Sequence, residues 1–216
     1  THGLLFWRSL TQWIGGMGII VLSIAILPIF GLNGMQLYAA EVTGLTYEKL
    51  SPRISDTAKM MWTTYVVLTA TEILGLWLCG MPIFDAVCHS FSTIATGGFS
   101  TKNNSLEFYD SAAIHYLVAF YMFISGINFV ILIYLVRGKA RNFFRDEELR
   151  WYTVAVVIFA LLLTIGLYVS RPGWTAIHME RSFRDSIFTV ISAMTSTGYT
   201  ISDYMYGPVV AWVVIF

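Results

Sequence analysis

Charged side chains are scarce in this sequence, making up 12% of its 216 residues, whereas an average soluble domain has about 25%. Hydrophobic residues make up 56%, and the mean hydropathy is +0.67. A chain of this length cannot hide so much apolar surface from water, so the composition excludes an ordinary soluble domain. A bilayer is the better solvent, because about 20 apolar residues form one spanning helix.

Net charge is absent, since 13 Lys and Arg balance 13 Asp and Glu. Without a basic field the chain is not expected to bind nucleic acid. Cysteine is scarce too, and we interpret Cys79 and Cys88 as small buried hydrophobic residues rather than a disulfide or a metal-binding pair. The sequence has no initial Met or signal peptide and ends inside an apolar run. We therefore expect an internal segment of a longer chain.

Long apolar runs alternate with shorter amphipathic segments. We predict long helices in residues 10–30, 57–78, 112–136 and 151–170, whereas segments 82–95 and 183–195 are too short to span a membrane. The run 10–30 contains Gly15, Gly16 and Gly18, which indicate a helix-packing surface or, alternatively, a hinge beside a pore.

The amphipathic segments lead into two polar stretches that align at a spacing of one hundred residues without a gap. We call them the pentads: Thr96-Gly97-Gly98-Phe99-Ser100 and Ser196-Thr197-Gly198-Tyr199-Thr200. The match extends upstream, where Asp85 aligns with Asp185 and Ser92 with Ser192. A single pentad would be interpreted as a turn, but two copies, each behind a short helix, indicate an internal repeat.

Non-helical backbone is tolerated at membrane depth only where it is buried in protein or lines a wet cavity. Gly98 and Gly198 can adopt backbone angles that other residues avoid, so that successive carbonyls point to one side. A ring of such carbonyls can replace the hydration shell of potassium. Each of the short helices predicted at 82–95 and 183–195 would also direct the negative end of its dipole toward the site. We expect Glu107, Asp110 and Asp203, which follow the pentads, to raise the local cation concentration.

The repeat predicts an organisation into five parts. Residues 57–136 form one copy and 151–216 a second, truncated copy, while 1–30 hold the closing helix of an earlier copy. The connecting segments 31–56 and 137–150 are polar. Counted over 31–59 and 137–150, the side of the membrane with these connections carries eight Lys and Arg, and the pentad side, 80–111 and 170–206, carries four. The positive-inside rule therefore makes the connections cytoplasmic.

Ionisable residues in apolar runs suggest an alternative, an intramembrane enzyme. Glu72 is a functional-site candidate by its depth, although it lies near a helix end from which it could reach the interface. With His89 and His115 it forms no catalytic motif, and we interpret the two histidines as structural or interfacial. An enzyme is therefore not expected.

Two segments, Phe6–Ile20 and His89–Thr101, together with the repeat, closely resemble the Trk/Ktr/HKT superfamily of potassium transporters, and Gly34–Tyr38 followed by Ala40-Glu41 indicates its TrkH branch. The resemblance implies an all-α membrane protein in which tandem M1–pore loop–M2 repeats of the potassium-channel type surround one pore. Residues 1–30 would then hold an inner (M2) helix, and 57–136 and 151–216 the second and third repeats.

The resemblance also implies a function, a site and partners. It implies potassium uptake across the bacterial inner membrane, through a filter formed mainly by the backbone carbonyls of Thr96, Gly97, Gly98, Phe99, Ser196, Thr197, Gly198 and Tyr199. Its pore loops would face the periplasm, and potassium would be the transported ion, without an organic cofactor. The implied partners are membrane lipid, a second copy of the chain in a homodimer, and a cytoplasmic nucleotide-binding regulatory subunit of the TrkA type.

A sodium-permeable or sodium-coupled transporter of the same superfamily is the main alternative. Some sodium-passing members have Ser in place of a filter glycine, and neither pentad has this replacement.

Overall fold

The computed structural model describes residues 1–18, 54–128, 131–132, 138, 140–170 and 176–202. In these ranges the regular elements are all helical, as predicted. They are α1 (His2–Trp13), the π-helical turn η1 (Ile14–Gly18), α4 (Ile54–Leu78), α5 (Ile83–Ile94), the 3-10 turn η3 (Ser105–Phe108), α6 (Ala112–Ser125), α8 (Ala140–Arg145), α9 (Glu147–Ser170) and α10 (Ala176–Met194). The predicted helix from 19 to 30, the connection from 31 to 53 and the last run from 203 onward lie outside the described residues.

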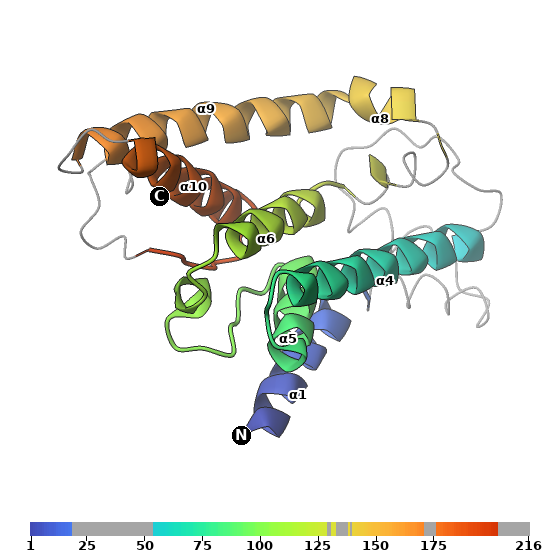
Figure 1. Cartoon of the computed structure of the whole chain (residues 1–216). Helices are drawn as coiled ribbons and strands as arrows, with labels where there is room; N and C mark the ends of the chain where they lie inside the picture. The colour runs from blue at the N-terminus through green and yellow to red at the C-terminus, as the bar shows by residue number, and fades with distance from the viewer. Residues whose placement is uncertain (19–53, 129–130, 133–137, 139, 171–175, 203–216) are drawn as a thin grey trace.

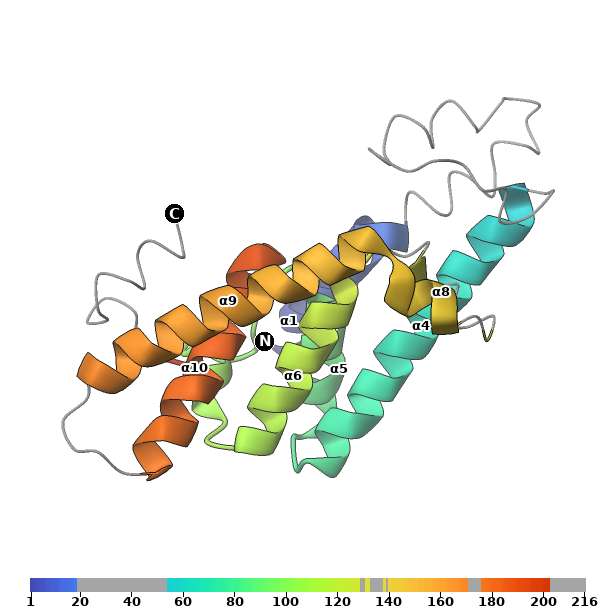
Figure 2. The same ribbon diagram turned by 90° about the horizontal axis from the view of Figure 1, so that it is seen from above.

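Helix α6 lies in the middle of the described structure, between α10 on one side and α4 and α5 on the other (Figures 1 and 2). Helix α9 crosses α10, and α1 packs against α5. Two helical stretches are long and apolar enough to cross a membrane, Lys59–Leu78 in α4 and Glu147–Tyr168 in α9. Helices α5 and α10 each end at a pentad, as the repeat predicts.

The connecting segment 137–150 was predicted to be a loop, but it is partly helical. It contains α8, and α9 begins at Glu147 rather than near residue 151. The carboxylate of Asp146 accepts hydrogen bonds from the backbone N–H groups of Glu148 and Leu149 at 3.0 and 3.2 Å. Such an N-cap satisfies donors that the first helical turn leaves free, and the acidic side chains of the first turn add a favourable interaction with the helix dipole.

Two further boundaries differ from prediction. Helix α10 begins at Ala176 instead of near residue 183, and Glu180 and Arg184, which pair at 3.8 Å one turn apart, support its additional turns. Helix α6 ends at Ser125 within a run that was predicted to be helical up to residue 136; Ile131 and Leu132 are helical again, and 129–130 and 133–136 lie outside the described residues. The Ser125 hydroxyl donates to the Met122 carbonyl at 2.9 Å.

A repeated junction joins the end of α1 to α4 and the end of α6 to α9. In the first junction Gly16 lies against the Tyr65 hydroxyl of α4 and against Ala95, and that hydroxyl donates to the Trp13 carbonyl at 2.9 Å. The backbone kinks at Gly16 within η1. The glycine-rich segment is thus a helix-packing surface, one of its two predicted uses.

The second junction has the same construction. Gly126 lies against the Tyr152 hydroxyl of α9 and against Thr195, and that hydroxyl donates to the Phe123 carbonyl at 3.4 Å. The aromatic rings of Phe123 and Tyr152 stack at 4.8 Å. Because Gly16 and Gly126 are as far apart in sequence as Trp13 and Phe123, α1 and α6 can be aligned residue by residue.

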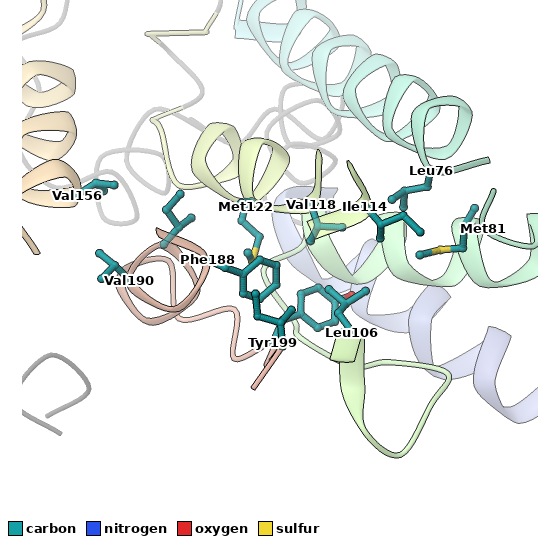
Figure 3. Close-up of a cluster of buried hydrophobic side chains, with 14 of the residues drawn as sticks. Leu76, Met81, Leu106, Ile114, Val118, Met122, Val156, Phe188, Val190 and Tyr199 are labelled. Carbon is teal, nitrogen blue, oxygen red and sulfur yellow. The ribbon is translucent and has the colours of Figure 1, made fainter. Parts of the chain in front are cut away.

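A buried apolar cluster connects α4, α6, α9 and α10 (Figure 3). Phe188 and Met122 lie at its centre, and both are fully buried. Tyr199 of the second pentad belongs to the same cluster. The apolar core between the helices therefore continues into the second pentad.

Replacing Gly16 by Ala tests this junction. A Cβ at residue 16 would lie 2.9 Å from the Tyr65 hydroxyl and 3.2 Å from the Ala95 side chain. We expect Gly16→Ala to lower stability by roughly 1–3 kcal/mol, because overpacking displaces neighbouring groups. Thermal unfolding of the full-length protein in detergent measures this change. Gly15→Ala is the matched control, since a Cβ there contacts nothing among the described residues. Equal unfolding temperatures for the two variants would contradict the prediction.

Candidate functional site

The first pentad begins with a tight turn at the end of α5. The Gly97 N–H donates to the Ser92 carbonyl at 2.7 Å, and the Thr96 N–H donates to the Thr93 carbonyl at 2.9 Å. This pair of bonds is the Schellman arrangement, which needs a left-handed residue after the helix. Thr96 is that residue, with φ of 51°. Gly98 is also left-handed, with φ of 68°.

The second pentad repeats this turn after α10. The Thr197 N–H donates to the Ser192 carbonyl at 2.9 Å, and the Ser196 N–H donates to the Ala193 carbonyl at 3.0 Å. Ser196 has φ of 54° and Gly198 has φ of 84°. The first and third residues of the two pentads thus share the left-handed conformation, and the sequence repeat is a structural repeat at this turn.

The two pentads touch each other. A Cβ on Gly98 would collide with the Thr197 carbonyl oxygen, so the first loop can approach the second only with glycine there. The buried Tyr199 hydroxyl reaches back to the first repeat, where it lies 3.2 Å from the His89 carbonyl and 3.4 Å from the Phe99 carbonyl. All eight residues predicted to form the site therefore belong to two adjoining loops.

The segment after the first pentad also holds the second. The Leu106 N–H in η3 donates to the Thr200 carbonyl at 3.2 Å, and the Thr200 N–H donates to the Ser105 hydroxyl at 3.2 Å. Leu106 is fully buried. Hydrogen bonds thus join the last residue of the second pentad to the segment that follows the first.

A family model described as TrkH, cation transport protein, matches residues 2–210. The chain belongs to the TrkH family.

Known members of the family are similar to the chain in sequence and in fold. The chain is 43% identical to the Trk system potassium uptake protein TrkH of Salmonella typhimurium and 42% identical to that of Escherichia coli K12, in each case over 92% of this chain. The crystal structure of the potassium transporter TrkH from Vibrio parahaemolyticus superposes with a TM-score of 0.78 at 34% identity and covers 99% of this chain. The chain spans about two fifths of the length of these proteins, 41% of the first two and 42% of the third. The all-α membrane fold follows from this match.

Two side chains of α1 that sequence reasoning left without a role contact the first pentad of this TrkH-family chain. Gln12 accepts a hydrogen bond from the Ser92 hydroxyl at 3.1 Å, and its amide lies 3.4 Å from the Gly97 carbonyl. One turn earlier, the Arg8 guanidinium donates to the Ser100 carbonyl at 2.7 Å and lies over the Phe99 ring. In the sequence, one sign of this contact was available: Arg8 and Gln12 are polar residues one turn apart on a mainly apolar helix.

The other ionisable residues and cysteines considered in the sequence analysis are mostly buried. Glu72 is completely buried beside Thr93, so the suggestion that it reaches the interface is wrong. Cys88 is buried and Cys79 half-buried, and both thiols are free. His115 contacts the Leu106 carbonyl at 3.1 Å.

His89 has a structural position behind the first pentad. Its Nδ1 lies 2.7 Å from the Asp85 carbonyl, which can only accept, so Nδ1 carries the proton. Its Nε2 then accepts from the Ser100 hydroxyl at 2.9 Å. Burial lowers the pKa of His89, which is therefore neutral at pH 7.

Asp85 anchors the beginning of α5 to the segment beyond the pentad. Its carboxylate accepts from the Tyr109 hydroxyl at 2.7 Å and pairs with the Lys102 ammonium at 3.2 Å. Burial alone would raise the pKa of Asp85, but the hydrogen bonds from Tyr109, Thr101 and Lys102 and the Lys102 charge outweigh it and lower the pKa. The aspartate is thus ionised at neutral pH and holds three parts of the first repeat together.

We expect Asp85→Asn to lower thermal stability at neutral pH, because the variant loses the ion pair with Lys102. A carboxylate with a depressed folded-state pKa contributes stability above its unfolded pKa of about 3.9 and loses it as the pH falls through the folded value. The difference in unfolding temperature between wild type and variant should therefore shrink only in acid. The exposed Asp110, replaced by Asn, is the control. A difference that is independent of pH would show that the charge of Asp85 is not responsible.

Proposed function

We propose that this chain is part of a potassium uptake protein of the bacterial inner membrane, and that its two pentads form part of a selectivity filter in a channel-like pore. The similar proteins from Salmonella typhimurium and Escherichia coli are named Trk system potassium uptake proteins. The paired pentads at the ends of α5 and α10 carry the proposal within this chain.

The backbone torsions of the pentads support coordination by carbonyls. In an extended strand, successive carbonyls point to opposite sides. In each pentad the first and third residues, Thr96 and Gly98 or Ser196 and Gly198, have positive φ, and the residue between them does not. Inverting φ at every second residue brings neighbouring carbonyls toward the same side, which is the arrangement that replaces the hydration shell of a potassium ion.

Hydrogen bonds distinguish the eight carbonyls that we assign to potassium. Within the described residues, those of Thr96, Gly98, Ser196, Thr197 and Gly198 accept no hydrogen bond. The Tyr199 carbonyl accepts from the Ser192 hydroxyl at 2.9 Å, and those of Gly97 and Phe99 have longer contacts of 3.4 Å. The five free carbonyls are accordingly the stronger ligands of the proposed filter.

Electrostatics also favour a cation at the pentads. Helices α5 and α10 end immediately before the pentads, so the negative ends of their dipoles face the proposed ion. Glu107 and Asp110, beyond the first pentad, are exposed and would attract cations to an outer vestibule on the periplasmic side.

The proposal includes the repeats and the partners. Residues 57–136 and 151–216 would be M1–pore loop–M2 repeats and 1–30 the M2 helix of a preceding repeat, joined by cytoplasmic connections at 31–56 and 137–150. A second copy of the chain and a TrkA-like nucleotide-binding subunit would bind the complete protein, the latter through these connections. Lipid would cover the exposed apolar residues of α9, among them Val157, Leu161 and Ile165.

The two filter glycines differ as test positions. A side chain at residue 98 would collide with the second pentad, whereas a Cβ on Gly198 contacts nothing among the described residues. Only the backbone conformation opposes Gly198→Ser, so this variant changes the proposed ligand with the least disturbance of packing.

In the full-length protein in liposomes, we expect Gly198→Ser to reduce potassium-over-sodium discrimination roughly tenfold, because a left-handed non-glycine residue costs on the order of 1–3 kcal/mol. Flux of potassium, rubidium, sodium and lithium ions measures this effect. Gly80→Ser is the matched control, since Gly80 has φ of 91°, lies in the α4–α5 turn and has the same open surroundings. Unchanged discrimination in Gly198→Ser would refute the filter assignment.

A further inference from the structure

Gln12 closes a ring of hydrogen bonds around the first pentad, although it belongs to the helix before the repeat. The Phe99 N–H donates to the Ser92 hydroxyl at 2.7 Å, and that hydroxyl donates to Gln12 Oε1 at 3.1 Å. Gln12 Nε2 completes the ring at 3.4 Å from the Gly97 carbonyl. The ring thus fixes the N–H group on one side of Gly98 and orients the carbonyl on the other.

The amide of Gln12 also occupies the space of a missing side chain. A Cβ on Gly97 would lie 2.5 Å from Gln12 Nε2 and 2.7 Å from Gln12 Cδ. The glycine at residue 97 and the amide at residue 12 are therefore complementary. This accounts for a glycine that has no left-handed conformation to explain it.

The second pentad is supported differently. The aligned residue is Thr197, whose hydroxyl shares a hydrogen bond with the Thr195 hydroxyl at 2.7 Å. The junctions at Gly16 and Gly126 align Gln12 with Met122, a buried apolar residue beside Phe188 (Figure 3). An amide from the preceding helix therefore supports one loop, and a hydroxyl pair within the loop supports the other.

We propose that Gln12 is a positioning residue for ion selectivity, which holds the Gly97 carbonyl and the Phe99 N–H in the geometry that discriminates potassium from sodium. This inference rests on the proposed function of the pentads as a filter. Gln12 does not touch the ion. It acts through the loop, and its long contact with the Gly97 carbonyl leaves that oxygen free to turn toward an ion.

The test uses the full-length protein in liposomes, with the fluxes of potassium, rubidium and sodium compared. Gln12→Leu removes both polar contacts at similar volume. Gln12→Glu keeps the acceptor for the Ser92 hydroxyl but has no donor for the Gly97 carbonyl. Because one hydrogen bond is worth a modest net free energy, we expect either variant to lower potassium-over-sodium discrimination roughly two- to tenfold. Met122→Leu, at the aligned position on α6, should leave discrimination unchanged.

A transplant separates positioning from a general structural effect. Gly97→Thr alone should impair discrimination, because its side chain displaces the Gln12 amide. The combination of Gln12→Met, Ala95→Thr and Gly97→Thr gives the first loop the support of the second, and should recover discrimination relative to Gly97→Thr. Recovery in this triple variant, but not in Gln12→Met with Gly97→Thr alone, shows that the hydroxyl pair and not relief of the clash restores the loop. A merely structural role, in which only the clash matters, predicts equal recovery in both.

The outcomes distinguish this inference from the proposed function. Wild-type discrimination in Gln12→Leu, together with its loss in Gly198→Ser, would overturn the role of Gln12 and leave the filter intact. Wild-type discrimination in both variants would overturn both. If Gln12→Leu does not fold, Gln12→Glu decides, and wild-type selectivity in that variant refutes the inference.

Discussion

The structure depends on how α5 and α10 stop where the pentads begin. Backbone groups released at a helix end need new partners, and where water is excluded the protein must supply them itself. After both α5 and α10 the same two Schellman hydrogen bonds do so, and they require a left-handed residue at Thr96 and at Ser196. After this turn most of the pentad carbonyls up to Gly98 and Gly198 accept no hydrogen bond within the described residues. The pentads are thus a consequence of helix termination, and their chemistry follows from their geometry.

The same backbone is supported by different side chains in the two copies. Ser92 accepts from the Phe99 N–H, whereas the aligned Ser192 donates to the Tyr199 carbonyl. The two loops are therefore equivalent in path but not in the field around each carbonyl. A pore built from such loops would be symmetric only approximately, and each repeat could be tuned separately.

The features that occur in both repeats could be predicted from the sequence. Those that depend on contacts between residues far apart in the chain could not. Segment 82–95 was predicted as a short helix, and α5 extends from Ile83 to Ile94. Gly98 was predicted to need a special backbone angle, and it has one. Thr96 was not, because a hydroxyl residue gives little local sign that it will be left-handed. The role of Gln12 could not be read either, since its partner Gly97 lies far along the chain and only the packing of α1 on α5 brings them together.

The sequence repeat and the packing unit are out of phase. In the proposed repeats an outer helix leads through a pentad to an inner helix, but the helix before each pentad packs against the inner helix that precedes its repeat. Helix α1 contacts α5, and α6 contacts α10, while Tyr65 and Tyr152 bond back to the carbonyls of those preceding helices. One repeat alone would therefore leave the helix before its pentad without the contacts of the preceding helix. The contacts that stabilise these helices thus cross from one proposed repeat to the next, as do those that bring the two pentads together.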